Sequence, residues 1–257
     1  MRNTILVWFC FVPLLTPICF AQPADNLESQ SNARLRVEAE RAIVDGKHEV
    51  ATQLLEKITK QNPTDATAFY HLGREAFCAG EIARSLAAFD RFLELAPNRK
   101  TSLWERGITC YYAKKFDQGR KQFELYQTYH SQDVENGVWH ILCKSGITGF
   151  EKAATKSLNI KSDTRVPMME IYDLFRQKAD PQDVIKAANA DAPKTQLNRQ
   201  KFYANLYVGL YYEATGDEKK ATEHLQAAVK HRIGHYMWDV ARVHLEVRKR
   251  EQEQAKD

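Results

Sequence analysis

Apolar residues in this 257-residue chain recur at intervals of three and four, the spacing of helices with one buried face. The pattern itself repeats about every 34 residues between positions 32 and 133, and it returns once near the C-terminus. Each repeat predicts two helices separated by a glycine and closed by a proline or a polar turn. Strand-like alternation of apolar and polar residues does not occur in the sequence. The clearest repeat spans residues 66–99, with key positions at Phe69, Leu72, Gly73, Gly80, Ser85, Phe89 and Pro97.

Two kinds of glycine explain the repeat physically. Gly73 is small where the two helices of a unit cross, and Phe89 is the large side chain expected to fill the space. Gly80 is expected to end the first helix, because a residue without a β-carbon adopts a positive φ at the lowest cost. The pattern is that of the tetratricopeptide repeat (TPR), and it matches four times here. One unit cannot bury its apolar face, so the sequence predicts an all-α solenoid of stacked TPR units.

The repeat weakens between residues 134 and 195, where we expect shorter helices. Asp180 and Pro181 are typical of a helix N-cap followed by proline at the first helical position. An amphipathic helix from His235 to Glu253 is expected to cap the stack, because a terminal repeat needs a polar outer face. The predicted organisation is a signal peptide (1–21), a flexible linker (22–31), three TPR units (32–133), a degenerate helical segment (134–195), a C-terminal TPR unit with a capping helix (196–250) and a polar tail (251–257).

The N-terminus has the pattern of a secretory signal peptide. Arg2 supplies the positive start, residues 5–15 are apolar but too few to span a bilayer permanently, and Ala21 is a small residue suited to cleavage. A lipoprotein signal is the alternative, with Cys19 as the lipidated residue. A lipobox requires a small residue before that cysteine, whereas Ile18 stands there. We therefore expect an exported protein, periplasmic or secreted, that is attached to a membrane only if Cys19 is lipidated.

Charge and motifs narrow the range of functions. The formal net charge is +4 and is spread along the chain, so no basic stripe indicates nucleic-acid binding. The sequence has no P-loop, nucleophile elbow or paired-histidine metalloprotease motif. It therefore predicts no catalytic residue, no cofactor and no metal site. The histidines near the last repeat, His224, His231 and His235, are interpreted as surface residues.

Three cysteines remain after removal of the signal peptide: Cys78, Cys110 and Cys143. Their odd number argues against a disulfide framework. Burial as small residues at helix contacts is the favoured interpretation, and one Cys78–Cys110 bridge between neighbouring units is the alternative.

Binding through the concave face is the function that the repeat geometry favours. In a TPR stack the first helix of each unit lines this face. Two aromatic residues per unit beside an arginine are typical of a protein-binding hot spot. The alternative is that these side chains pack under a neighbouring helix or a dimer partner. The groove residues predicted from the register are Tyr70, Arg74, Phe77, Trp104, Ile108 and Tyr111.

The order of the segments suggests a family. Three repeats precede a tryptophan-containing unit (138–142) and a segment of short helices, and Phe202-Tyr203, Gly209-Leu210-Tyr211-Tyr212 and Gly216-Asp217 follow. This order resembles the NlpI-type TPR lipoproteins of Gram-negative envelopes. The resemblance implies a homodimeric envelope adaptor that docks peptidoglycan hydrolases and a processing protease, with no activity of its own. The weak lipobox at Cys19 departs from that family.

Together these features predict a non-catalytic exported scaffold that binds envelope proteins or peptides in its concave groove. The alternative is a self-associating structural subunit of the envelope whose aromatic face forms a homodimer interface.

Overall fold

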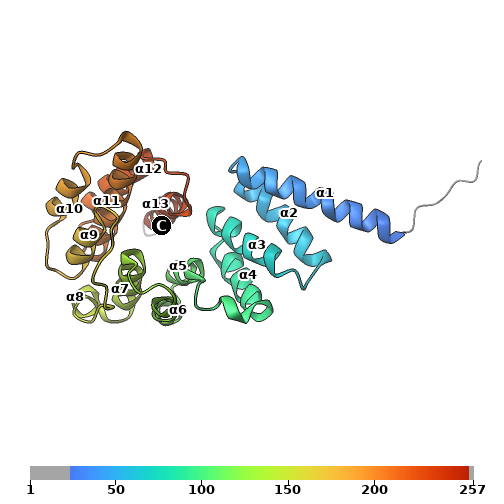
Figure 1. Cartoon of the computed structure of the whole chain (residues 1–257), viewed down its shortest axis with the longest axis horizontal. Helices are drawn as coiled ribbons and strands as arrows, with labels where there is room; N and C mark the ends of the chain where they lie inside the picture. Colours follow the sequence, from blue (N-terminus) through green and yellow to red (C-terminus); the bar gives the residue numbers. More distant parts are fainter. Residues whose placement is uncertain (1–23, 255–257) are drawn as a thin grey trace, which may run out of the picture.

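The computed structural model describes residues 24–254, which form a curved stack of helices (Figure 1). The predicted signal peptide and Cys19 lie outside this range. Thirteen α-helices, one 3-10 helix and no strand make up the described part. The helices are α1 (Ala24–Val44), α2 (His48–Gln61), α3 (Ala66–Cys78), α4 (Ile82–Leu95), η1 (Pro97–Arg99), α5 (Trp104–Tyr112), α6 (Phe116–Tyr129), α7 (Val134–Thr148), α8 (Phe150–Ala154), α9 (Met168–Phe175), α10 (Pro181–Ala188), α11 (Lys194–Ala214), α12 (Glu218–Lys230) and α13 (Tyr236–Gln254).

The predicted all-α solenoid of TPR units is confirmed. Helices α1 to α6 form three successive antiparallel pairs, and α11 with α12 forms a fourth. Gly80 ends α3 with a φ of +76°, as expected for a helix end that favours glycine. In the third unit Lys114 takes the equivalent position with a φ of +56°. The register of the repeat therefore holds even where its glycine is missing.

The close crossing of helices within a unit has the predicted cause. A β-carbon on Gly73 would lie 2.6 Å from the ring of Phe89, and one on Gly107 would lie 2.6 Å from the ring of Phe123. Both phenylalanines are fully buried in the space that the glycines leave. The pairing of a small and a large residue thus sets the distance between the two helices.

The degenerate segment contains the short helices expected from its sequence. Asp180 and Asp183 form a capping box at the start of α10, and Pro181 occupies its first turn. Helix α9 buries Ile171, Tyr172 and Phe175. At the other end of the chain, α1 begins at Ala24, inside the segment 22–31 where the sequence indicated a linker.

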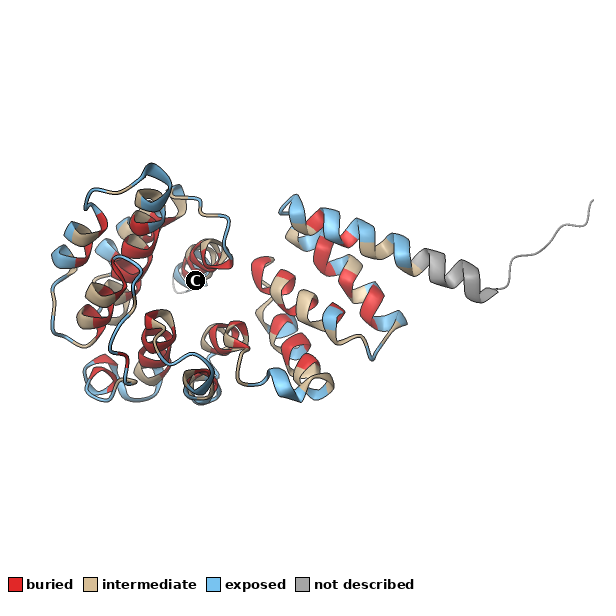
Figure 2. Cartoon of the chain, viewed as in Figure 1, coloured by how far each residue is buried: buried red, intermediate tan, exposed pale blue. Residues whose placement is uncertain are grey.

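The apolar core is divided unevenly along the stack (Figure 2). One large cluster extends from Phe77 to Val243 and includes Trp139, Tyr207 and Phe175. Two small clusters lie within α1 to α4 and the turn before α5. The core is therefore largest in the part of the stack that contains the weak repeat segment and the C-terminal helices.

Helix α13 lies on the inner side of the curve, as Figure 1 shows. It packs along α12 and also reaches α3. The ring of Tyr236, its first residue, lies 5.5 Å from that of Phe77 and 5.6 Å from that of Trp104. The predicted terminal helix is thus present, and it contacts the concave face as well as the last repeat. Within residues 24–254, none of the helices is long and apolar enough to cross a membrane.

Candidate functional site

A cavity of about 330 Å³ opens on the concave side of the stack. Helices α5, α6, α7 and α11 form its walls, and the start of α13 closes one side. Its apolar lining is rich in aromatic rings, which supply large contact areas at low entropic cost. The apolar lining residues are Trp104, Ile108, Phe123, Tyr126, Trp139, Tyr203 and Met237.

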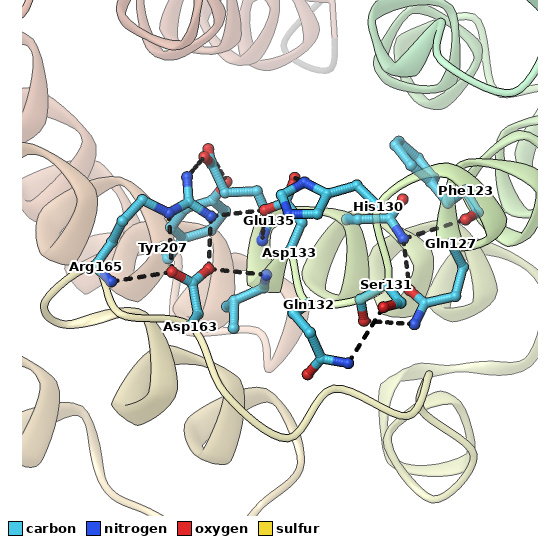
Figure 3. Close-up of polar contacts among 12 residues, drawn as sticks. Phe123, Gln127, His130, Ser131, Gln132, Asp133, Glu135, Asp163, Arg165 and Tyr207 are labelled. Carbon is cyan, nitrogen blue, oxygen red and sulfur yellow. Dashed lines mark hydrogen bonds and ion pairs between the residues drawn. The ribbon is translucent and has the colours of Figure 1, made fainter.

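A network around Arg165 forms one polar wall of the cavity (Figure 3). The guanidinium donates to Glu135 Oε2 at 2.6 Å, to Asp133 Oδ1 at 2.7 Å and to Asp163 Oδ2 at 2.6 Å. Burial by itself would lower the pKa of Arg165, but the three carboxylates raise it. Arg165 comes from the non-helical segment between α8 and α9, so this network ties that segment to the start of α7.

Glu135 is the carboxylate of the network that also contacts α11. Its Oε1 accepts a hydrogen bond of 2.8 Å from the hydroxyl of Tyr207 on α11. Burial, with a contribution from neighbouring Asp133, raises the pKa of Glu135 to about 7, although Arg165 and Tyr207 act in the opposite direction. The charge of this wall therefore changes near neutral pH.

Two buried polar atoms of cavity-lining residues lack a hydrogen-bond partner. These are the indole Nε1 of Trp139, a donor, and the amide Oδ1 of Asn136, an acceptor. The Nδ2 of Asn136 is occupied, because it donates to the carbonyl of Phe123 at 3.2 Å and to Gln127 Oε1 at 3.1 Å. Unpaired buried polar groups cost free energy, and a bound ligand is one way to recover it.

The six predicted groove residues do not converge on one site. Trp104 and Ile108 line the cavity. Arg74 lies over the ring of Tyr236 at 4.4 Å and bonds Glu105, which also accepts from the Tyr70 hydroxyl. Phe77 is fully buried against the same Tyr236 ring.

Tyr111 lies at the far end of α5, with its ring 5.4 Å from that of Trp139. In this conformation four of the six side chains thus contact other parts of the chain outside the cavity. Whether the six bind a partner stays a prediction.

The sequence did not indicate several residues of the cavity. Arg165 lies in a segment without a recognisable motif, and Arg199 and Tyr203 come from the long helix α11, far from α5 in the chain. The two acidic residues at the start of α7, Asp133 and Glu135, were the available signal. Acidic residues are common in the first turn of a helix, so this signal is weak.

The cysteines and C-terminal histidines occupy separate places. Cys78, Cys110 and Cys143 are buried free thiols, so the favoured interpretation of burial is confirmed and the alternative Cys78–Cys110 bridge is not formed. His224 pairs with Asn205, and His231 pairs with Asn198. His235 instead stacks on Trp104 at the edge of the cavity, with ring centroids 6.4 Å apart.

Comparison with known proteins supplies an architectural likeness only. No protein-family model matches the chain. Among solved structures, MamA (residues 41 to the end) from Desulfovibrio magneticus RS-1 is 17% identical with a TM-score of 0.46, covering 77% of this chain and 93% of that one. A MamA structure labelled MSR-1 C2 is 14% identical with a TM-score of 0.46, covering 78% of this chain and 96% of that one. These resemblances are too distant to assign a function.

Proposed function

We propose that this protein is a non-catalytic scaffold that binds an extended segment of a partner protein in the concave cavity. The observation that carries the proposal is the aromatic cavity whose lining residues Trp139 and Asn136 leave one donor and one acceptor unpaired. A peptide backbone offers one carbonyl and one N–H group per residue. A peptide therefore carries both kinds of group that these two atoms lack as partners.

The size and charge of the cavity define the ligand further. A volume of about 330 Å³ accommodates one or two side chains of a peptide and not a folded domain. Trp104 and Tyr126 provide aromatic surface for an apolar anchor residue. Arg199 and His130 are exposed at the rim, where they favour an acidic residue next to the anchor.

The resemblance of the segment order to NlpI-type proteins supports a proposal for the class of partner. On that basis we propose partners in the bacterial envelope, with peptidoglycan hydrolases and a processing protease as the first candidates. This part of the proposal also requires export, for which the support is the signal-peptide pattern of residues 1–21.

Peptide selection on the purified protein tests the binding site. A library of random linear peptides displayed on phage is selected against the wild type, and the affinity of an enriched peptide is measured by fluorescence anisotropy. Trp104→Ala is expected to weaken binding about tenfold or more, since an aromatic anchor contact is lost. Trp139→Phe keeps a ring but removes the donor, and a loss of about 2- to 10-fold is expected.

Arg84→Ala is the matched control, because Arg84 is exposed on α4 and does not line the cavity. Circular dichroism establishes that each variant is folded. Enriched peptides that bind Trp104→Ala and Trp139→Phe as tightly as wild type would show that the cavity is not the binding site.

Self-association is a second candidate, and a separate observation supports it. Val37 and Val44, on α1, are 65% and 85% exposed, and Val50 on α2 is 47% exposed. Residues seven apart lie on one face of a helix, so Val37 and Val44 form a short apolar stripe at the N-terminal end of the stack. A second copy of the chain could cover this stripe without using the cavity.

A further inference from the structure

A second side-chain cluster joins α2, α3 and α13. His48 begins α2, Cys78 ends α3, and Asp239 lies in the first turn of α13. The ligand atoms of these three residues lie within 4.8 Å of one another. They border a second cavity of about 520 Å³, which opens to solvent and shares the lining residue His235 with the concave cavity.

From this geometry we propose that His48, Cys78 and Asp239 bind one zinc ion. Imidazole nitrogen, thiolate sulfur and carboxylate oxygen are the three ligand types of protein zinc sites. Three protein ligands leave the fourth tetrahedral position to a water molecule, which the adjoining cavity can supply.

The separation of the ligand atoms supports tetrahedral coordination. His48 Nε2 lies 3.4 Å from Asp239 Oδ1. That distance is long for a hydrogen bond, but metal bonds of about 2.0 Å at the tetrahedral angle place nitrogen and oxygen about 3.3 Å apart. The Cys78 sulfur lies at most 4.8 Å from the other two ligand atoms, so it needs to approach them by at most about 1.3 Å to reach the separation of about 3.5 Å expected from a zinc–sulfur bond of about 2.3 Å.

Glu75 supplies the outer-sphere partner that zinc-binding histidines have. Its Oε2 lies 2.8 Å from His48 Nδ1, and the residue is 6% exposed. This hydrogen bond places a proton on Nδ1 and directs Nε2 towards Cys78 and Asp239. Glu75 and Cys78 are three residues apart and share a face of α3, so one helix provides both a ligand and the group that orients another.

Charge and protons balance when zinc binds. The Cys78 thiolate and the Asp239 carboxylate together neutralise the dication. Binding displaces the thiol proton of Cys78 and any proton on His48 Nε2, and both pass to solvent. Arg242 competes for the same carboxylate at 3.4 Å from Oδ1, but it also pairs with Glu246 at 2.9 Å and need not leave its place.

The same residue types could instead form a thiol nucleophile with a histidine base. Asp239 faces the imidazole nitrogen that a base would turn towards the thiol, and this geometry disfavours such a pair. A metal ion uses all three groups together. It would link the C-terminal helix to the second and third helices of the chain.

Cobalt substitution tests the proposal on the purified, chelator-treated protein. Co²⁺ is added, and the absorption spectrum is recorded for the thiolate-to-cobalt charge-transfer band and the d–d bands of a tetrahedral site. Zinc is then titrated in, and it is expected to displace cobalt. Cys78→Ser is expected to abolish the charge-transfer band, while His48→Ala and Asp239→Asn are expected to weaken cobalt binding strongly.

Two kinds of control make the outcome decisive. Cys110→Ser and Cys143→Ser remove the other buried thiols and should leave the band unchanged. Glu75→Gln should keep the band but lower the affinity about 10- to 100-fold, as expected for an outer-sphere partner. Circular dichroism on the metal-free variants separates loss of binding from loss of folding. A folded wild type without a charge-transfer band, or a band that survives in Cys78→Ser, overturns the proposal.

Discussion

The N-terminal units (α1–α4) and the C-terminal arc (α5–α12) are built from similar helices but hold together differently. In the N-terminal units the repeat is regular, and the core consists of two small clusters around Leu55 and Phe89. In the C-terminal arc the irregular helices α7–α10 separate two regular pairs, yet one continuous cluster fills the interior. A regular solenoid contacts only its neighbours, whereas the irregular part curves around α13 and buries more.

The difference shows that regularity of sequence and size of the core are separate properties. Of the buried residues in the large cluster, Phe77 and Cys78 are the members that come from α1–α4. Both lie near α13: Phe77 contacts Tyr236, and the carbonyl of Cys78 accepts a hydrogen bond from Arg242. The N-terminal units therefore depend on α13, in addition to α5, for their attachment to the rest.

Truncating one core residue in each region should have the largest effect on the free energy of unfolding. The two variants also test whether the regions unfold independently. Phe175 is fully buried in the large cluster, and Phe175→Ala is expected to cost about 3–5 kcal/mol of unfolding free energy. Leu55→Ala, in the small cluster, is expected to cost about 2–5 kcal/mol. Urea unfolding monitored by circular dichroism measures both.

Amide hydrogen exchange then shows which helices lose stability in each variant. We expect Phe175→Ala to lower protection throughout α7–α12, and Leu55→Ala to lower it in α1–α4 alone, because the small cluster around Leu55 ends at Ala88 on α4. Equal loss of protection along the whole chain in Leu55→Ala would mean that the two regions unfold as one unit and that their cores are not separate.

Buried charge gives a second, smaller contrast between the regions. In the C-terminal arc, Glu135 shares Arg165 with two other carboxylates, and its pKa is raised to about 7 from 4.5. A carboxyl group with a higher pKa in the folded state holds its proton more tightly there, so folding loses stability as pH rises through this window. The loss is at most about 3 kcal/mol, the equivalent of the pKa difference.

Glu135→Gln should remove that dependence. The difference in unfolding free energy between the variant and wild type is measured in urea at a series of pH values from 4.5 to 8. We expect wild type to lose stability relative to the variant as the pH rises from 4.5 to about 7. Above about pH 7 the difference in unfolding free energy should be constant. Glu94→Gln, which makes the same change at an exposed carboxylate of the N-terminal units, is the matched control. A parallel pair of curves for Glu135→Gln and wild type would contradict the assignment.

The two regions also differ in how much of them could be predicted from sequence. The helix pairs, the positive φ at Gly80 and the contact of Gly73 with Phe89 were predictable, because each depends on residues within one repeat. The place of α13 was not, since an amphipathic helix shows which face is buried but not which surface covers it. The proposed zinc ligands could not be grouped from the sequence for a related reason: they stand at positions 48, 78 and 239, without the spacing of a motif.

The cavity was predicted only in part. Trp104 and Ile108 line it because the repeat register places first-helix residues on the concave face. Arg74 and Phe77 follow the same register, but Tyr236 covers them, and no local pattern indicates a contact between residues so far apart in the chain. The repeat register thus places side chains where neighbouring repeats determine the surroundings, and it cannot do so where the chain returns to the concave face.

The smallest expected change in stability accompanies a test of the exposed end of the N-terminal units. The double variant Val37→Glu with Val44→Glu places two charges on the apolar stripe of α1, where both valines are more than half exposed. Stability should change by no more than about 0.5 kcal/mol, because neither side chain is in the core.

If the stripe is covered by a second copy, the mass measured by light scattering should fall from dimer to monomer in the variant. Ile147→Glu, at an exposed site on α7, is the control and should keep the wild-type mass. A dimer that persists in the double variant would show that the interface does not include the stripe of α1. A wild type that is monomeric at all concentrations would contradict self-association and leave peptide binding as the proposed function.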